Sequence, residues 1–252
     1  MLGQEHRIVG ISGYTVRPPR ARAEKPKISA FTSAKIDKIL ALEPDCVFGF
    51  SDLQADIAAS LIRKGVQVTV FNQRSIDQIL SMMLQVAAVV GQVDHGNALI
   101  AQIIASMTAI ETQAREMDRR QIPRPTVFFE EWDEPHISAI KWVSELITIA
   151  GGVDCFAELG QQAMGRDRII ADGAEIIARN PHIIIGSWCG KKFRADTVSA
   201  RPGWDAISAV RDKQLFEIKS PDILQPGPAA LTDGLKQLHG IIHGWRRQFS
   251  AD

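Results

Sequence analysis

The stretch ILALEPDCVF, residues 39–48, recurs in a weaker form as IIARNPHIII at residues 176–185. Each copy reads as the end of a helix, a polar residue followed by proline, and then an apolar run. Proline disfavours helical backbone in the residue before it and therefore ends the helix. The apolar residues that follow are mainly β-branched or aromatic, which is typical of a strand buried on both faces. The repeat predicts two copies of one helix-to-strand unit.

Strands and helices alternate around both copies. The first copy continues through a helical segment at 53–64 into VQVTVF at 66–71, and the second reaches QLFEI at 214–218 through a helical stretch at 204–211. Further strands are expected at IVGI, residues 8–11, and at TVFF, residues 126–129. This alternation predicts parallel sheets.

A long helical stretch separates the two copies. Residues 75–90 and 94–117 carry apolar residues at helical spacing. The run from Asn97 to Arg119 contains neither Gly nor Pro, which predicts one rigid helix about 34 Å long at 1.5 Å per residue.

The expected fold is therefore α/β, with two Rossmann-like lobes that contain parallel sheets and are joined by a long spine helix. We place the first lobe at residues 1–90, the spine at 91–121 and the second lobe at 122–252. Two such lobes are expected to enclose a ligand cleft, because ligands of parallel sheets bind at the carboxyl ends of the strands.

The composition is that of an ordinary globular protein, with 252 residues, 45% of them hydrophobic and 23% charged. The formal net charge is zero, which argues against nucleic acid as a partner. No apolar run approaches the roughly 18 residues of a membrane span. Residues 1–7 do not read as a signal peptide, so we expect the chain as written to be cytoplasmic, or periplasmic if a signal precedes Met1. The three cysteines, Cys46, Cys155 and Cys189, lack zinc or disulfide spacing and are expected to be buried thiols.

Aromatic side chains recur at the predicted carboxyl ends of strands. They are Tyr14, Phe50, Trp132, His136, Trp188 and Phe193. Each could seal the core, but together they favour a surface that covers a flat ligand, because large planar side chains cover apolar faces well. The other tryptophans, Trp142, Trp204 and Trp245, lie in helical context and are expected to be packing residues.

The segment EEWDEPH, residues 130–136, has alternative interpretations. Glu130, Glu131, Asp133 and Glu134 could supply an acid/base pair, but proximity in sequence does not place two carboxylates across a substrate. Asp133 could instead be the N-cap of the next helix. Phosphate-loop and catalytic-elbow motifs do not occur. His239 and His243 have metal-binding spacing but no third ligand, so we expect neither metal nor catalysis and interpret the segment as a ligand-binding loop.

The chain resembles the cobalamin-binding proteins of ABC import systems, within the class of two-lobed metal-chelate-binding proteins with a helical spine (class III periplasmic-binding-protein-like). The similar segments span nearly the whole chain: RIVGISGYTVRPPRA (7–21), IDKILALEPDCVFG (36–49), LIRKGVQVTVFNQRSIDQIL (61–80), WVSELITIAGGVDCF (142–156), IIARNPHIIIG (176–186) and RPGWDAISAVRDKQLFEI (201–218). The resemblance implies a non-catalytic monomer that holds cobalamin or a related corrinoid between lobes that hardly close.

The resemblance also implies roles for particular residues. The expected ligand contacts are Tyr14, Arg17, Phe50 and Ser51 in the first lobe, and Trp132, His136 and Trp188 in the second. Arg166 and Arg168 stand where the family usually has aromatic residues, and they would suit polar groups of a ligand. Docking on an ABC permease is expected through carboxylates near the lobe tips: Asp52, Asp56, Asp172 and Glu175.

The sequence departs from the family pattern at its start, where Met1-Leu2-Gly3 resembles the end of a helix that normally follows a first strand. We therefore expect a smaller sheet in the first lobe. Three other functions stay open: intracellular carriage of the corrinoid, binding of haem or a ferric siderophore in the same fold, and a two-lobed α/β transferase. An Arg/Lys cluster would favour a siderophore, an axial His or Tyr would favour haem, and a transferase would need a nucleotide site.

Overall fold

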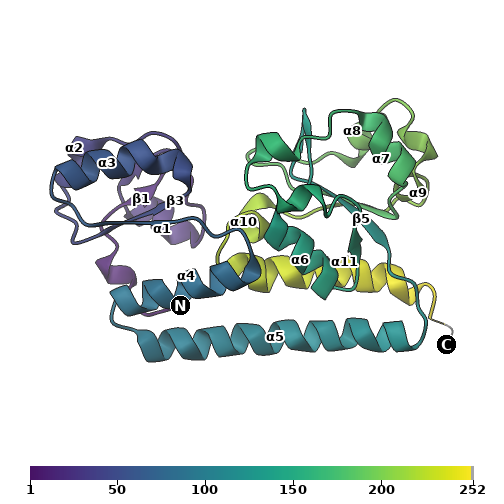
Figure 1. Cartoon of the computed structure of the whole chain (residues 1–252), viewed down its shortest axis with the longest axis horizontal. Coiled ribbons are helices and arrows are strands. Elements are labelled where there is room, and N and C mark those ends of the chain that lie inside the picture. The colour runs from purple at the N-terminus through teal and green to yellow at the C-terminus, as the bar shows by residue number, and fades with distance from the viewer. Residues whose placement is uncertain (251–252) are drawn as a thin grey trace. The chain divides into compact units, whose positions relative to one another are not determined.

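The computed structural model, which describes residues 1–250, contains two compact units (Figure 1). The first unit is Met1–Gln73 with Leu84–Asn97, and the second is Arg74–Met83 with the chain from Ala98 onward. Helices α4 (Ile76–Val89) and α5 (Val93–Arg119) each contribute residues to both units. The lobe boundaries expected at residues 90 and 121 stay a prediction, because a helix shared by two units defines no single boundary.

The second unit is built on a four-stranded sheet in the order β10-β9-β5-β8, and every pairing in it is parallel. The strands are β5 (Thr126–Glu130), β8 (Val153–Asp154), β9 (Ile183–Gly186) and β10 (Leu215–Glu217). The strands predicted from TVFF, HIII and QLFEI are thus confirmed, and so is the α/β class with parallel sheets.

Successive residues of these strands enter two different cores, because side chains alternate between the faces of a sheet. Val127 and Phe129 pack in one core with helices α6 (Lys141–Ile149) and α11 (Leu235–Arg247). Phe128 packs in the other with residues of α7 (Gly173–Arg179), α8 (Ala195–Ser199) and α9 (Ser208–Arg211). Figure 1 shows these two groups of helices on opposite sides of β5. Burial on both faces explains why the strands read as continuous apolar runs.

Short elements complete the second unit. They are the hairpin strands β6 (Trp132–Asp133) and β7 (His136–Ile137), helix α10 (Ser220–Ile223), 3₁₀ turns at Leu159–Gln161, Gly165–Arg168 and Trp204–Ala206, and a π-helical turn at Ala230–Gly234. The packing roles predicted for Trp142, Trp204 and Trp245 are confirmed, since all three are buried.

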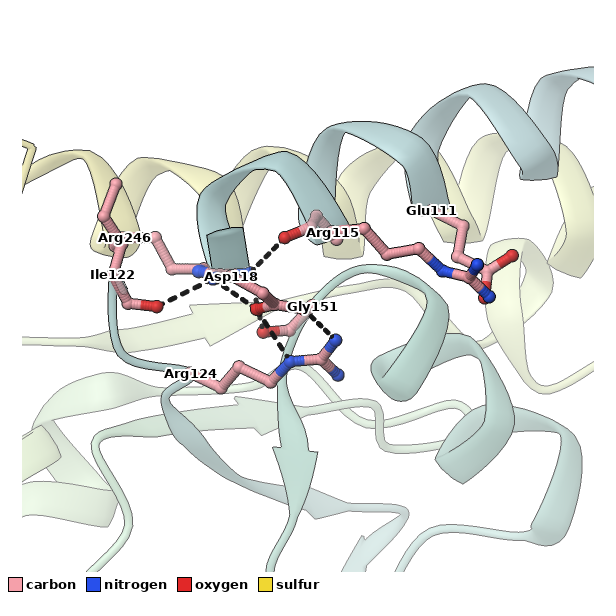
Figure 2. Close-up of polar contacts among 8 residues, drawn as sticks. Glu111, Arg115, Asp118, Ile122, Arg124, Gly151 and Arg246 are labelled. Carbon is pink, nitrogen blue, oxygen red and sulfur yellow. Dashed lines mark hydrogen bonds and ion pairs between the residues drawn. The ribbon is translucent and has the colours of Figure 1, made fainter. Parts of the chain in front are cut away.

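One buried arginine ties the end of α5 to α11, which runs beside it (Figures 1 and 2). Arg246 donates from Nη2 to the Asp118 carboxylate at 2.7 Å and to the Ile122 carbonyl at 2.8 Å, and from Nη1 to the Ala114 carbonyl at 3.1 Å. The Gly151 carbonyl lies 3.5 Å from Nη1. A cation at the carboxyl end of a helix is also favoured by the helix dipole.

The same contact explains a glycine after α6. Gly151 has φ +91°, and a Cβ built there would lie 2.7 Å from Arg246 Nη1 and 2.9 Å from Ala114 Cβ. Glycine is therefore required both for the left-handed backbone and for the close approach of α5.

Asp118 should make stability depend on pH at the acid end. Hydrogen bonds from Arg124 and then Arg246 hold the pKa of Asp118 below its usual value. The resulting stabilisation is complete above the unfolded pKa of about 3.9 and is lost as the pH falls through the lower folded pKa. In Asp118→Asn we expect a lower melting temperature at pH 7 and a shallower decline of that temperature below about pH 4. Glu116→Gln, which removes an exposed ion pair with Arg119, is the control. If the melting temperature of Asp118→Asn declined below about pH 4 as steeply as that of the wild type, Asp118 would not be the source of the pH dependence.

The first unit contains two separate parallel strand pairs. One pair is β1 (Ile11–Ser12) with β2 (Lys27–Ser29), and the other is β3 (Val47–Phe50) with β4 (Val68–Phe71). Helices α1 (Pro19–Glu24), α2 (Ile36–Leu40) and α3 (Ala55–Arg63) accompany them, with 3₁₀ turns at Glu5–Arg7 and Asp52–Gln54. The expected strand at residues 8–11 is wrong in its position, because β1 begins at Ile11, and Ile8 and Val9 are exposed.

Little apolar surface is buried inside the first unit. Its buried apolar residues are Ala21, Ile39, Leu61 and Ala87, whereas Phe48 and Val70 on its strands are exposed. Both large hydrophobic cores belong to the second unit. Because burial of apolar area is the main source of stability, most of the apolar stabilisation of the protein comes from the second unit.

The cysteines are free thiols. Cys46 and Cys155 are partly buried, and burial raises the pKa of the Cys155 thiol. The expectation of a buried thiol is wrong for Cys189, which is exposed because it lies in the loop after β9 and packs in neither core. Across residues 1–250, no helix is both long enough and apolar enough to span a membrane.

Candidate functional site

The segment that follows β5 forms a hairpin. β5 ends at Glu130, and β6 and β7 then pair antiparallel, with Trp132 opposite Ile137 and Asp133 opposite His136. The N-cap role considered for Asp133 is wrong, because α6 begins at Lys141, and Ile140 precedes it without a side-chain cap. The hairpin therefore projects from the carboxyl end of a central strand, where ligands of parallel sheets bind.

Glu130 is fully buried at the base of this hairpin and accepts four hydrogen bonds. Arg201 donates to both carboxylate oxygens, at 2.7 and 3.1 Å. His136 Nδ1 lies 2.8 Å from Oε1, and Trp188 Nε1 donates to Oε2 at 3.1 Å. A buried carboxylate is stable only when it is paired and hydrogen-bonded in this way.

The next two carboxylates are paired as well. Arg168 forms a two-pronged ion pair with Glu131, at 2.7 and 3.0 Å, and donates to the Ser138 carbonyl. Asp133 pairs with Lys191. Each carboxylate thus neutralises a specific cation of a neighbouring loop. This arrangement positions the hairpin, and it gives no support to an acid/base pair among Glu130, Glu131 and Asp133.

The two tryptophans at the strand ends lie in different environments. Trp188 is 5% exposed and packs against Phe193, with 5.1 Å between ring centroids. Phe193 in turn covers the end of β9 so closely that a Cβ on Gly186 would lie 2.0 Å from its ring. Trp132 is half-buried, and its indole N–H donates to the Glu134 carbonyl at 2.9 Å. Ligand contact is therefore open to Trp132, whereas contact with Trp188 requires its neighbours to move.

Lys191 lies over both indoles. Its Nζ is 5.9 Å from the Trp132 ring and 5.2 Å from the Trp188 ring, and about half of its side chain is exposed. This distance is within the range of cation–π attraction. The chain thus presents an indole face and an ammonium group together at this edge of the second unit.

The remaining residues expected on the second lobe differ in accessibility. Arg166 is exposed, while Arg168 is buried in its pair with Glu131. His136 is partly buried, and its ring packs against Trp204 with 5.6 Å between centroids. Asp172 is exposed and accepts from the Ala174 N–H at the start of α7, and Glu175 is exposed and paired with Arg179 at 2.5 Å.

In the first unit, Tyr14 is 64% exposed at the end of β1. Phe50 is partly buried at the end of β3, and its ring lies 6.5 Å from that of Phe31. Ser51 is buried, with φ 74°, and its hydroxyl lies 2.8 Å from an oxygen of Asp52. The other residues expected there, Arg17, Asp52 and Asp56, are all exposed.

Two residues of the site were missed in the sequence. Arg201 and Lys191 complete the ion pairs of Glu130 and Asp133, from 71 and 58 positions away. A basic residue shortly after Trp188 was a usable signal for Lys191, because loops that follow neighbouring parallel strands meet at one edge. No cluster of three or more potential metal ligands occurs within residues 1–250.

Comparison with known proteins identifies the family. Residues 1–221 match the periplasmic binding protein family. The chain is 20% identical over 249 residues to YvrC, an ABC transporter substrate-binding lipoprotein of Bacillus subtilis, with coverage of 96% of this chain and 75% of YvrC. It is 21% identical over 243 residues to the vitamin B12-binding protein of Vibrio cholerae, with coverage of 94% of this chain and 81% of that protein.

Solved structures share the fold. The periplasmic heme-binding protein RhuT from Roseiflexus sp. RS-1 in apo form has a TM-score of 0.76 and 23% identity, covering 96% of this chain and 93% of RhuT. The likeness at this identity concerns the fold alone. The match over residues 1–221 shows that the chain belongs to the periplasmic binding protein family, whose members are non-enzymatic substrate-binding proteins of ABC transporters.

Proposed function

We propose that the protein binds a corrinoid, cobalamin or a close relative, and delivers it to the permease of an ABC importer. The observation that carries this proposal is the half-buried indole of Trp132, held on a hairpin at the carboxyl end of the second unit's sheet. A macrocycle edged with amide groups suits a surface that combines an aromatic face with polar neighbours. The relation to the vitamin B12-binding protein of Vibrio cholerae supports the same class of ligand.

Rigidity of the hairpin supports binding without large rearrangement. Glu130, Glu131 and Asp133 are each tied to a cation outside the hairpin. A surface that is already ordered loses less conformational entropy when a ligand binds. The ligand contacts that we propose are Trp132, Arg166 and Lys191 in the second unit, and Tyr14, Arg17 and Phe50 in the first.

Haem is the second candidate, and Tyr14 is the observation that favours it. The Tyr14 hydroxyl forms no hydrogen bond with the described residues, and the side chain is largely exposed. A phenolate is a known type of axial ligand for haem iron. His136 is a poorer candidate for that role, because its Nδ1 bonds with Glu130 and its ring packs on Trp204.

Tyr14→Phe separates the two candidates. Phenylalanine keeps the ring that would cover a corrinoid but removes the phenolic oxygen that would bind iron. With cyanocobalamin, we expect equilibrium dialysis of wild type and Tyr14→Phe to give dissociation constants within about threefold, under 1 kcal/mol. With hemin, absorption spectra of the two proteins should be alike. Retention of hemin but not of cyanocobalamin, with a Soret band that shifts in Tyr14→Phe, would establish haem as the ligand instead.

Trp132→Ala should weaken corrinoid binding by about 1–3 kcal/mol, as loss of a large aromatic contact does. The melting temperature should change little, because the side chain is only half-buried. Trp142→Ala is the matched control. Trp142 is buried in α6 and donates to the Ile223 carbonyl at 2.9 Å, so this variant should be less stable than the wild type but bind the corrinoid with the same affinity. The reverse pattern, measured by dialysis and thermal melting, would assign Trp132 to the core.

Docking on a permease completes the proposed function. Asp52 and Asp56 in the first unit, and Asp172 and Glu175 in the second, place carboxylates on the surface. Exposed carboxylates can meet arginines of a partner and steer association. YvrC is a lipoprotein and RhuT is a periplasmic protein, which supports a place outside the cytoplasmic membrane for this chain too.

A further inference from the structure

A hollow lies at the amino-terminal ends of the strands in the second unit's sheet. Its volume is about 520 Å³, and it is lined by Pro123, Arg124, His182, Asp212, Gln214, Trp245, Gln248 and Phe249. Arg124 precedes β5, His182 precedes β9, Gln214 precedes β10, and the last three residues belong to the end of α11 and the turn after it. The volume is in the range of about 300–1,000 Å³ that is typical of small-molecule sites.

Aromatic rings form one wall of this hollow. The centroids of Trp245 and Phe249 are 4.6 Å apart, and those of His182 and Trp245 are 5.1 Å apart. Trp245 is buried, whereas Phe249 is 52% exposed. A large aromatic ring left open beside a hollow favours a planar apolar group as the occupant.

Arg124 supplies a donor that is not used up within the protein. Asp118 accepts from its Nε at 3.0 Å and from its Nη2 at 2.5 Å (Figure 2). Nη1 has no acceptor among the described residues. Since Asp118 is also paired with Arg246, one carboxylate serves two guanidinium groups, and a positive charge is left over for an anionic partner.

His182 supplies a second donor. The backbone N–H and the hydroxyl of Thr126 lie 3.2 and 2.7 Å from its Nδ1. A backbone N–H can only donate, so Nδ1 is the acceptor and the proton of the neutral ring is assigned to Nε2. Arg124 and His182 both line the hollow, and each has an N–H group that no described residue accepts.

Asp212 adds the opposite charge. It is exposed, and its carboxylate forms no ion pair with any described residue. A ligand that satisfies the whole hollow therefore needs three parts: an anionic group for Arg124 and His182, a cationic group for Asp212, and a planar apolar ring for Phe249 and Trp245.

We propose that this hollow is a second small-molecule site that binds an aromatic zwitterion, with aromatic α-amino acids as its chemical class. In such a molecule one carbon carries the carboxylate and the ammonium group, and the neighbouring carbon carries the aryl ring, so all three required features are present. The hollow lies at the amino-terminal ends of the strands, whereas Trp132 follows the carboxyl end of β5. The hollow is therefore separate from the proposed corrinoid site.

Calorimetric titration of the full chain with three related probes tests this proposal. The probes are L-phenylalanine, phenethylamine, which lacks the carboxylate, and 3-phenylpropionate, which lacks the ammonium group. We expect L-phenylalanine to bind at least tenfold more tightly than either fragment. Phe249→Ala and Asp212→Asn, both at exposed positions, should each weaken L-phenylalanine at least tenfold. Asp212→Asn should leave 3-phenylpropionate unaffected.

Arg247→Gln is the matched control, because Arg247 is exposed on α11 but does not line the hollow. This variant should bind L-phenylalanine with the same affinity as the wild type. The proposal is overturned by an absence of heat with L-phenylalanine at concentrations on the order of 1 mM, by equal binding of all three probes, or by an Asp212→Asn variant that weakens every probe alike. Corrinoid binding by the same variants should be unchanged, which separates this test from that of the proposed function.

Discussion

Glu130→Ala is expected to lower the free energy of unfolding by about 3–5 kcal/mol, the usual cost of removing one partner of a buried ion pair. Glu130 is fully buried and accepts hydrogen bonds from Arg201, His136 and Trp188. Without it, the Arg201 guanidinium and the Trp188 N–H lose their acceptor in a place that is largely closed to water. Urea unfolding at neutral pH, followed by far-UV circular dichroism, measures the loss.

Glu134→Ala is the control for this change, since Glu134 lies on the same hairpin but is exposed. Its effect should stay within about 0.5 kcal/mol, as for most surface substitutions. A Glu130→Ala protein as stable as wild type would mean that the four hydrogen bonds do not persist in solution. Glu130→Gln should fall between the two, because the amide keeps the shape but loses the charge.

Arg246→Met should destabilise the protein by about 2–4 kcal/mol, the combined cost of a lost charge-assisted hydrogen bond and an unsatisfied buried carbonyl. Methionine fills a similar volume, so the effect comes from polar groups and not from a cavity. The Ile122 carbonyl loses its donor, and Asp118 keeps only Arg124. Chemical unfolding of the variant gives the magnitude.

Arg247→Met, one position further along α11 and exposed, serves as the control and should be nearly neutral. The double variant of Arg246→Met with Asp118→Asn should lose less than the sum of the two single changes, because the residues are in direct contact. Strict additivity would contradict the arrangement in Figure 2.

The parallel strand pairs could be predicted from the sequence because their signals are local. A polar residue and proline before an apolar run mark both β3 and β9, and the structure confirms both strands. The continuous α5 follows from a long run without Gly or Pro. The stretch at 204–211 was harder, since it divides into a 3₁₀ turn and the short α9.

The polar contacts of the site could not be predicted in the same way. Glu130 and Arg201 are 71 positions apart in the sequence. Local sequence patterns do not reveal contacts over such a separation. The sequence suggested that Arg168 is available to a ligand. In the structure Ile169 forms a bridge with Ile137 of β7, which brings the preceding Arg168 into an ion pair with Glu131. Burial of this kind depends on how loops meet, which only the assembled sheet decides.

The isolated strand pairs of the first unit have a consequence for association between molecules. In a two-stranded sheet each strand is an edge, and a bare edge is a template on which another chain can add a strand. Val47 and Ser51 donate their N–H groups toward β4, so Phe48 and Phe50 direct theirs away from β4. Gln54 accepts from the Phe50 N–H at 2.9 Å and donates from Nε2 to the Phe31 carbonyl at 2.8 Å, so this donor of β3 is already in use. We therefore expect Gln54 to hinder the pairing of another chain with β3 beside the exposed Phe48.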